Sequence, residues 1–143
     1  MSATDQLLSF VIQHPLHQAM GVRSIEAADG TATIDVTVEG DMVNAAGMFH
    51  GGIVYTVCDM ACYAALLTRL QPGENAATHD IHVSLMGAAR RGDRVRFTAT
   101  VMRQGRNLAF MEAQVHGGER LLARATVTKT ILRPQAPAPT PQR

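Results

Sequence analysis

The stretch from Asn44 to Leu67 reads NAAGMFHGGIVYTVCDMACYAALL, and it contains the helix that the rest of the chain is predicted to bury. Its second half is almost wholly apolar, yet it contains one carboxylate, Asp59. Pro72 and Gly73 follow as stop signals, so the sequence predicts a long helix over residues 51–70. Because this helix is apolar on nearly every side, the rest of the chain must bury it.

Alternating apolar and polar residues, typical of half-buried strands, lie on both sides of the predicted helix. Before the helix, residues 22–30 and 31–40 form two such segments, joined by a turn at Ala28-Asp29-Gly30. After the helix, the pattern predicts four strands within residues 77–87, 93–104, 107–117 and 119–132. In residues 77–87, His79, Ile81, Val83 and Leu85 alternate with Asp80, His82 and Ser84.

The N-terminal residues form a short amphipathic helix that ends near His14-Pro15, and residues 14–21 form a connector. The predicted order is therefore helix, two strands, one long helix and four strands. This order indicates an α+β protein with an antiparallel sheet wrapped around one central helix. We expect one domain over residues 1–133 and a disordered, proline-rich tail over residues 134–143.

The composition excludes several classes of protein. The 143 residues are 46% hydrophobic, enough for a core, and a net charge of +1 argues against nucleic acid as the main partner. Cys58 and Cys62 lack the spacing and companions of a zinc site, so we expect buried, reduced thiols and no metal. No targeting segment or membrane-length apolar run is visible, so we expect a cytoplasmic protein without a membrane partner.

A short motif connects the central helix with a known family. Asn44 is followed by His50-Gly51-Gly52, and Asp59 lies seven positions beyond the second glycine. With the four strands that follow, this motif resembles the hotdog-fold acyl-CoA thioesterases, in particular the PaaI-like branch of the phenylacetate pathway. The resemblance extends from about Leu16 to Leu132 and implies the hotdog fold.

The resemblance also implies roles for five residues of the motif and the strand after it. Asp59 corresponds to the catalytic carboxylate, either nucleophile or general base, and the backbone N–H of Gly51 to the donor that polarises the thioester carbonyl. Asn44 matches a polar residue near the thioester or the water, and Thr78 a hydroxyl that orients water or substrate. His50 is expected to support the loop.

The chemistry is physically reasonable, but one helix cannot bring its two parts together. Preorganised N–H donors to an oxyanion are worth about 3 to 4 kcal/mol, and a helix N-terminus has free N–H groups. Gly51 and Asp59 are eight residues apart, which is about 12 Å along a helix. A symmetric pair of chains solves this, with Gly51 of one chain facing Asp59 of the other. The resemblance likewise implies homodimers, often paired into homotetramers.

Six further residues are candidates for substrate binding. Gly52 lets a substrate approach the backbone, although both glycines could serve close packing alone. Tyr55 and Tyr63 lie one helical turn before and after Asp59 and could line an acyl pocket or the core. Arg90, Arg91 and Arg106 offer forked donors for the phosphates of coenzyme A, or a solvated surface.

The predicted activity is hydrolysis of an aryl- or arylacetyl-CoA to the free acid and coenzyme A, with no cofactor. A medium-chain or other acyl-CoA is the alternative substrate. A hotdog hydratase or dehydratase would use an acid–histidine arrangement, and no histidine lies near Asp59 in sequence. A module that binds acyl-CoA without catalysis is the third possibility.

Overall fold

The computed structural model describes residues 1–135 and 139–142. Apart from the short helix α2 and a 3-10 turn, its order of helices and strands agrees with the order predicted from sequence. The central helix begins at Gly51 as predicted. The elements are α1 (Ala3–Gln13), α2 (Pro15–Ala19), β1 (Glu26–Ala28), β2 (Thr31–Thr37), a 3-10 turn η1 (Gly40–Met42), α3 (Gly51–Leu67), β3 (Asn75–Leu85), β4 (Arg94–Gln104), β5 (Leu108–Gly117) and β6 (Arg120–Leu132).

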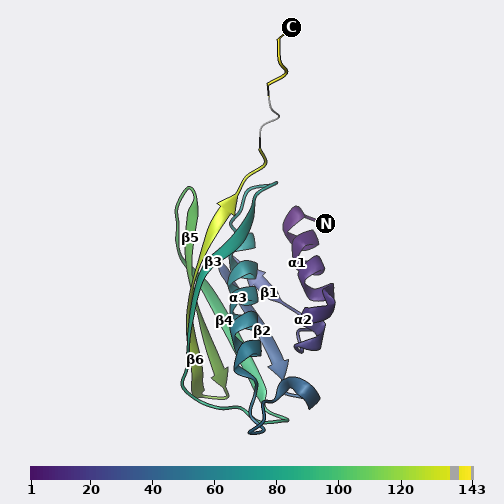
Figure 1. Ribbon diagram of the computed structural model, residues 1–143, viewed down its shortest axis with the longest axis vertical. Helices are drawn as coiled ribbons and strands as arrows, with labels where there is room; N and C mark the ends of the chain where they lie inside the picture. The colour runs from purple at the N-terminus through teal and green to yellow at the C-terminus, as the bar shows by residue number, and fades with distance from the viewer. Residues whose placement is uncertain (136–138, 143) are drawn as a thin grey trace.

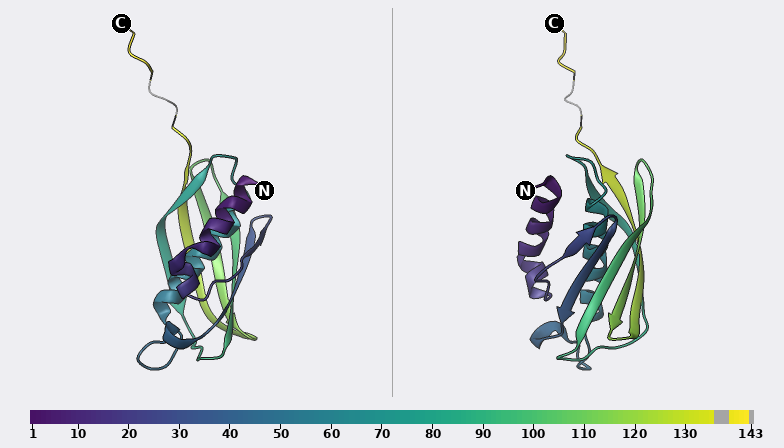
Figure 2. Two further views of the ribbon diagram at one scale, coloured as in Figure 1. Left: turned by 90° about the vertical axis from the view of Figure 1, so that its right-hand side faces the viewer. Right: turned by 180° about the vertical axis from the view of Figure 1, so that it is seen from behind.

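The strands form one antiparallel sheet in the order β1-β2-β4-β5-β6-β3, and this sheet curves around α3 (Figure 1). The helices α1 and α2 lie on the opposite side of α3, so α3 is enclosed between the sheet and the N-terminal segment (Figure 2). Side chains of α3 that face the sheet, among them Val57, Ala61 and Leu66, are fully buried. The predicted α+β fold with one wrapped helix is confirmed.

The β1–β2 turn fixes where α3 ends. Asp29 and Gly30 both have positive φ, 50° and 77°, as a two-residue hairpin turn of this twist requires. The hydroxyl of Thr68 donates to Ala65 O and accepts from Gly30 N–H, both at 2.7 Å. These bonds join the end of the helix to the turn, so α3 ends at Leu67 and not at residue 70 as predicted.

The connector over residues 14–21 was predicted without regular structure, but it contains the short helix α2. The ring nitrogen Nδ1 of His14 accepts from Leu16 N–H at 3.2 Å, which caps the helix, and Pro15 occupies its first turn. Proline is favoured at this position because the first helical N–H has no partner within the helix. This helix positions His17 next to α3.

The even alternation predicted for residues 77–87 is wrong at His79. Thr78 pairs with Lys129 and Asp80 pairs with Thr128, so His79 is an extra residue and forms a β-bulge. Below the bulge Val83 faces the core, while above it Thr78 points toward α3. His79, which was expected on the inward face, is therefore exposed, and it is the hydroxyl of Thr78 that points toward Asp59 of α3.

Both cysteines are free and fully buried in the core, as predicted. Burial, with a smaller contribution from the neighbouring Asp59, raises the pKa of the Cys58 thiol to about 12. The pKa of Cys62 is raised further, chiefly by burial. Both thiols therefore stay protonated at neutral pH.

Two expectations concern regions outside the sheet. Among the residues that the structure describes, every helix is too short or too polar to cross a membrane. The expectation of disorder over residues 134–143 stays a prediction, since residues 136–138 and 143 lie outside the described residues.

Candidate active site

The first turn of α3 leaves one backbone donor free. The N–H of Gly52 donates to the ring Nδ1 of His50 at 2.9 Å, and the N–H groups of Ile53 and Val54 donate to His50 O. Within the described residues, the N–H of Gly51 has no acceptor. His50 thus caps the helix and supports its loop, and Gly51 presents the single unused donor of this turn.

A pocket of about 160 Å³ lies beside Gly51, with mostly apolar walls that include Val54, Leu85 and Leu122. Asn44 also lines this pocket. Its side-chain oxygen is used within its own loop, since it accepts from the N–H groups of Ala46 and Met48 at 2.9 and 3.1 Å. The amide nitrogen of Asn44 is therefore the group that remains for a ligand.

Asp59 lies on the middle of α3, where two donors converge on one of its oxygens. The hydroxyl of Thr78 donates to Asp59 Oδ1 at 2.7 Å, and the ammonium of Lys129 donates to the same atom at 2.8 Å. Lys129 also donates to the oxygen of Thr78, which closes a triangle of three side chains. The structure thus brings together Asp59 and Thr78, two of the predicted site residues, and adds Lys129 from β6.

These side chains line a second pocket, of about 230 Å³, which also contains Tyr63 and His17. The hydroxyl of Tyr63 donates to Asn75 Oδ1 at 2.6 Å, so its ring forms a pocket wall and its oxygen is already engaged. Partial burial raises the pKa of this phenol. His17 Nδ1 lies 2.7 Å from Val11 O, so Nδ1 carries the proton of this bond.

The pocket at Gly51 and the pocket at Asp59 share no lining residue. Eight residues of helix separate the two positions, or about 12 Å. Within one chain, the free N–H and the carboxylate therefore face different spaces. A larger groove of about 550 Å³, between α1 and the end of α3, contains none of the predicted site residues.

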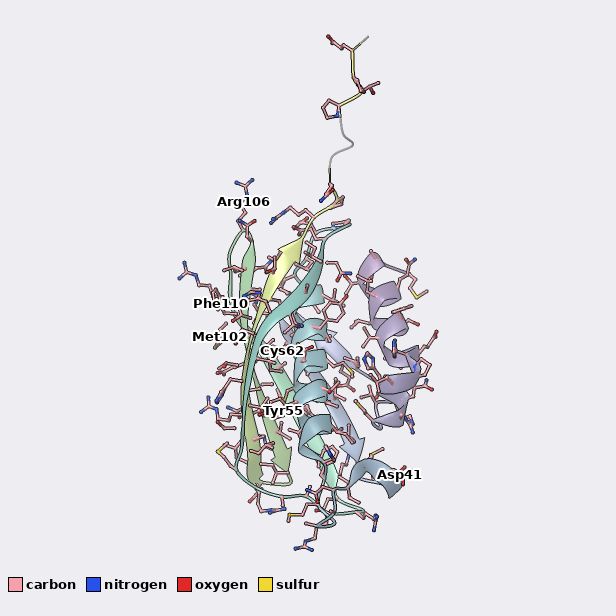
Figure 3. All side chains as sticks on the ribbon, viewed as in Figure 1. Asp41, Tyr55, Cys62, Met102, Arg106 and Phe110 are labelled. Carbon is pink, nitrogen blue, oxygen red and sulfur yellow. The ribbon has the colours of Figure 1, made fainter. Side chains whose placement is uncertain are left out.

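The remaining candidates are scattered over the molecule. Tyr55 donates to Val83 O at 3.2 Å and does not line either pocket. Arg90 pairs with Met48 in an isolated bridge and Arg91 donates to Gly40 O, so both lie near the loop of Asn44. Arg106 lies at the opposite end of the sheet from Asp41 (Figure 3). The three arginines of one chain therefore do not form one phosphate site.

Sequence reasoning missed Lys129 and His17. A signal for Lys129 was present, because it alternates in phase with Val127 and Ile131, the inward-facing residues of β6. It is also the single lysine of the chain. For His17 no comparable signal exists, since forty-two positions separate it from Asp59 and α2 was not predicted. The absence of a histidine near Asp59 in sequence argued against a hydratase. In the structure, however, His17 lines the same pocket as Asp59.

Comparison with known proteins identifies the family of this chain. The family model of the thioesterase superfamily matches residues 46–123, a segment that contains the glycines, Asp59 and the strands β3 to β5. The chain belongs to the thioesterase superfamily. It is thus a thioester hydrolase with the hotdog fold. Human acyl-coenzyme A thioesterase 13 is 31% identical over 109 residues, which cover 75% of this chain and 77% of the human protein.

Solved structures of related proteins have the same fold. Zebrafish thioesterase superfamily member 2 superposes with a TM-score of 0.77 at 28% identity, covering 87% of this chain and 93% of that protein. A mutant of the phenylacetic acid degradation protein PaaI from Thermus thermophilus superposes with a TM-score of 0.74 at 26% identity, covering 81% and 97%. PaaI-like proteins are thus among the structural neighbours of this thioesterase.

A metal is not suggested by the site. Within residues 1–135 and 139–142, no three side chains of His, Cys, Asp or Glu are grouped so that they could hold an ion. The polar groups that converge on Asp59 are a hydroxyl and an ammonium, and an ammonium has no lone pair to offer a metal.

Proposed function

We propose that this thioesterase hydrolyses an acyl-CoA to the free acid and coenzyme A at a site shared by two chains. The observation that carries the proposal is the separation of two complementary groups. The free N–H of Gly51 lies beside one pocket and the carboxylate of Asp59 beside another. A twofold pair of chains would bring the donor of one chain to the carboxylate of the other, twice.

In such a site the thioester oxygen would accept the Gly51 N–H, at the positive end of α3. Negative charge develops on this oxygen in the transition state, and a preorganised donor stabilises it. Asp59 then acts as general base on water or as nucleophile toward the acyl carbon. The amide nitrogen of Asn44, which its own loop leaves free, supplies a second polar contact near the thioester.

The long edge of the sheet supports the pairing. At one edge β1 has three residues, whereas at the other β3 has eleven, most of them exposed, with unpaired backbone groups along its free side. A long open edge is prone to pair with another strand. The exposed side chains of Tyr55, Leu85 and Met86 lie on or next to this edge. We propose that two β3 strands pair in a homodimer, and that dimers assemble into a homotetramer.

For the acyl group we propose an aryl or arylacetyl chain. The pocket beside Gly51 is mostly apolar and measures about 160 Å³. An apolar protein cavity of about 150 Å³ can hold benzene, so a single aromatic ring fits this volume. A linear medium-chain acyl group is the alternative, since a flexible chain can also extend into the pocket at Asp59.

For the coenzyme we propose that Arg90 and Arg91 contact phosphates, because both lie near the loop of Asn44. Arg106 of the same chain is too remote to join them and stays a candidate only for a neighbouring site (Figure 3). The reaction needs water and no cofactor, since coenzyme A is part of the substrate.

The test is an assay of thiol release from phenylacetyl-CoA, benzoyl-CoA and medium-chain acyl-CoAs. We expect release above background, with kcat reduced at least about 100-fold in Asp59→Asn, the range of a lost general base. Asp41→Asn is a matched control, because Asp41 is exposed in η1 and lines neither pocket. Wild-type protein that releases no thiol from any of these substrates contradicts the proposal.

His17 in the Asp59 pocket keeps a hydratase as the second candidate. A hydratase would add water across an enoyl-CoA without releasing thiol, so crotonyl-CoA separates the two activities. We expect no loss of the enoyl group. A protein that only binds acyl-CoA would give neither product, while still binding coenzyme A in calorimetry.

A further inference from the structure

Lys129 is the one buried charged side chain in the described part of the chain, with 2% of its surface exposed. It lies on the inward face of β6, between Val127 and Ile131, at a position where the alternation of the strand predicts a hydrophobic residue. Burying an ammonium is costly, and replacing a whole buried ion pair by apolar side chains of similar volume is often neutral or stabilising. A lysine at this position therefore needs an explanation other than packing.

The contacts of the ammonium fix the direction of the neighbouring hydroxyl. An ammonium can only donate, so Thr78 Oγ1 accepts from Lys129, and the single proton of Thr78 is left to donate to Asp59. Both donors reach the same carboxylate oxygen, Oδ1. No donor within the described residues reaches Oδ2, and the Asp59 side chain is 37% exposed. One oxygen is thus saturated and the other is open to the pocket.

The far side of Lys129 is fixed as well. Its nitrogen lies 5.4 Å from the centre of the Tyr63 ring, within the range of a cation–π contact. Tyr63 is in turn held by Asn75, whose side-chain oxygen also accepts from Ala76 N–H at 2.8 Å. The ammonium therefore lies between an aromatic face and the carboxylate, with little freedom to move.

We propose that Lys129 is a positioning residue which, with Thr78, occupies Oδ1 of Asp59 and presents Oδ2 as the reacting oxygen. This inference rests on the proposed function, because it assigns the orientation of the same carboxylate. It holds for either role of Asp59, since a base and a nucleophile both need one unoccupied oxygen in a fixed direction. Without Lys129 the carboxylate can rotate, and the hydroxyl of Thr78 is no longer directed.

The experiment compares Lys129→Met, Asp59→Asn and the double variant on the best acyl-CoA substrate. Methionine keeps a long apolar chain without the charge, so the fold and the melting temperature should be retained. We expect kcat to fall about 100-fold, the cost of misplacing a reacting group, while KM and the affinity for coenzyme A stay unchanged. Arg124→Met is the matched control, because it removes a surface ion pair on the same strand and should leave kcat unchanged.

The double variant separates positioning from a structural role. If Lys129 acts through Asp59, its loss adds nothing once the carboxylate is gone, so the double variant retains the residual rate of Asp59→Asn. A further fall below that rate overturns the assignment. So does wild-type kcat in Lys129→Met when Asp59→Asn is inactive, although the proposed function then stands. A wild-type protein without thiol release overturns both.

Discussion

Gly51 can be tested by a substitution that removes its N–H and leaves the helix intact. Proline is tolerated at the first helical position, and His50 before it has φ −64° and ψ 124°, an extended conformation that a following proline accepts. We expect Gly51→Pro to lower kcat about 100- to 1,000-fold, as expected for loss of one oxyanion donor. The measurement is steady-state thiol release, with circular dichroism to verify the helix.

Gly51→Ala is the control, because it adds the same Cβ and keeps the N–H. That Cβ would lie 2.8 Å from Leu85 Cδ1, the end of a half-exposed side chain that can move aside. We expect alanine to retain most of the activity that proline loses. If both variants are equally impaired, the steric effect explains the loss and the N–H is not the oxyanion donor.

Of the residues at the site, those predictable from sequence are the ones whose residue type is unusual for the helix that contains them. A carboxylate in an apolar helix and two glycines at its start are visible without a structure. Lys129 could have been found by following the alternation of β6 one step further. The separation of Oδ1 from Oδ2 could not, because it depends on three side chains from α3, β3 and β6.

At the scale of elements, the bulge in β3 can be tested by removing its extra residue. Thr78 pairs with Lys129 and Asp80 with Thr128, so His79 is the residue in excess. Deleting His79 leaves both pairs in place and should keep Thr78 on the side of Asp59. We expect deletion of His79 to leave kcat close to that of the wild type, whereas Thr78→Val lowers kcat by about 10- to 100-fold, since the orienting hydroxyl is lost. Activity and melting temperature measured together verify that the fold survives.

His79→Ala is the companion variant, because it keeps the extra residue and removes only an exposed side chain that contacts Thr130. We expect nearly wild-type activity from it. Loss of activity in the deletion but not in His79→Ala would contradict this interpretation, because the bulge itself would then be needed to orient Thr78.

The bulge and α2 are two features that periodicity did not predict. A bulge is set by backbone pairing between distant strands, which no local pattern records. The five residues of α2 are too few for a periodic signal, and only the cap by His14 and the proline at its start favoured a helix. The long helix and the four strands after it were predictable, because their apolar residues recur with clear periods.

At the scale of the whole molecule, the fold places the proposed donor and the proposed carboxylate of each chain in separate pockets, which we propose are two half-sites. The curved sheet buries one helix, and this helix presents its donor at one end and its carboxylate at the middle, in separate pockets. Thr78 and Leu85 both belong to β3, the strand that forms the free edge of the sheet. Pairing of two such edges would run the two helices in opposite directions, which is the arrangement that the chemistry needs.

Mixing two inactive variants tests this arrangement most directly. Asp59→Asn retains a working Gly51, and Gly51→Pro retains a working Asp59, so a mixed dimer would contain one complete site and one that lacks both groups. The two variants are co-expressed with different tags, or unfolded together and refolded, and thiol release is compared with each variant alone. With random pairing, half of the dimers are mixed, and the account predicts recovery of about one quarter of wild-type activity. If the mixture is as inactive as its components, although light scattering and double-tag purification show mixed dimers, then Gly51 and Asp59 do not act across two chains.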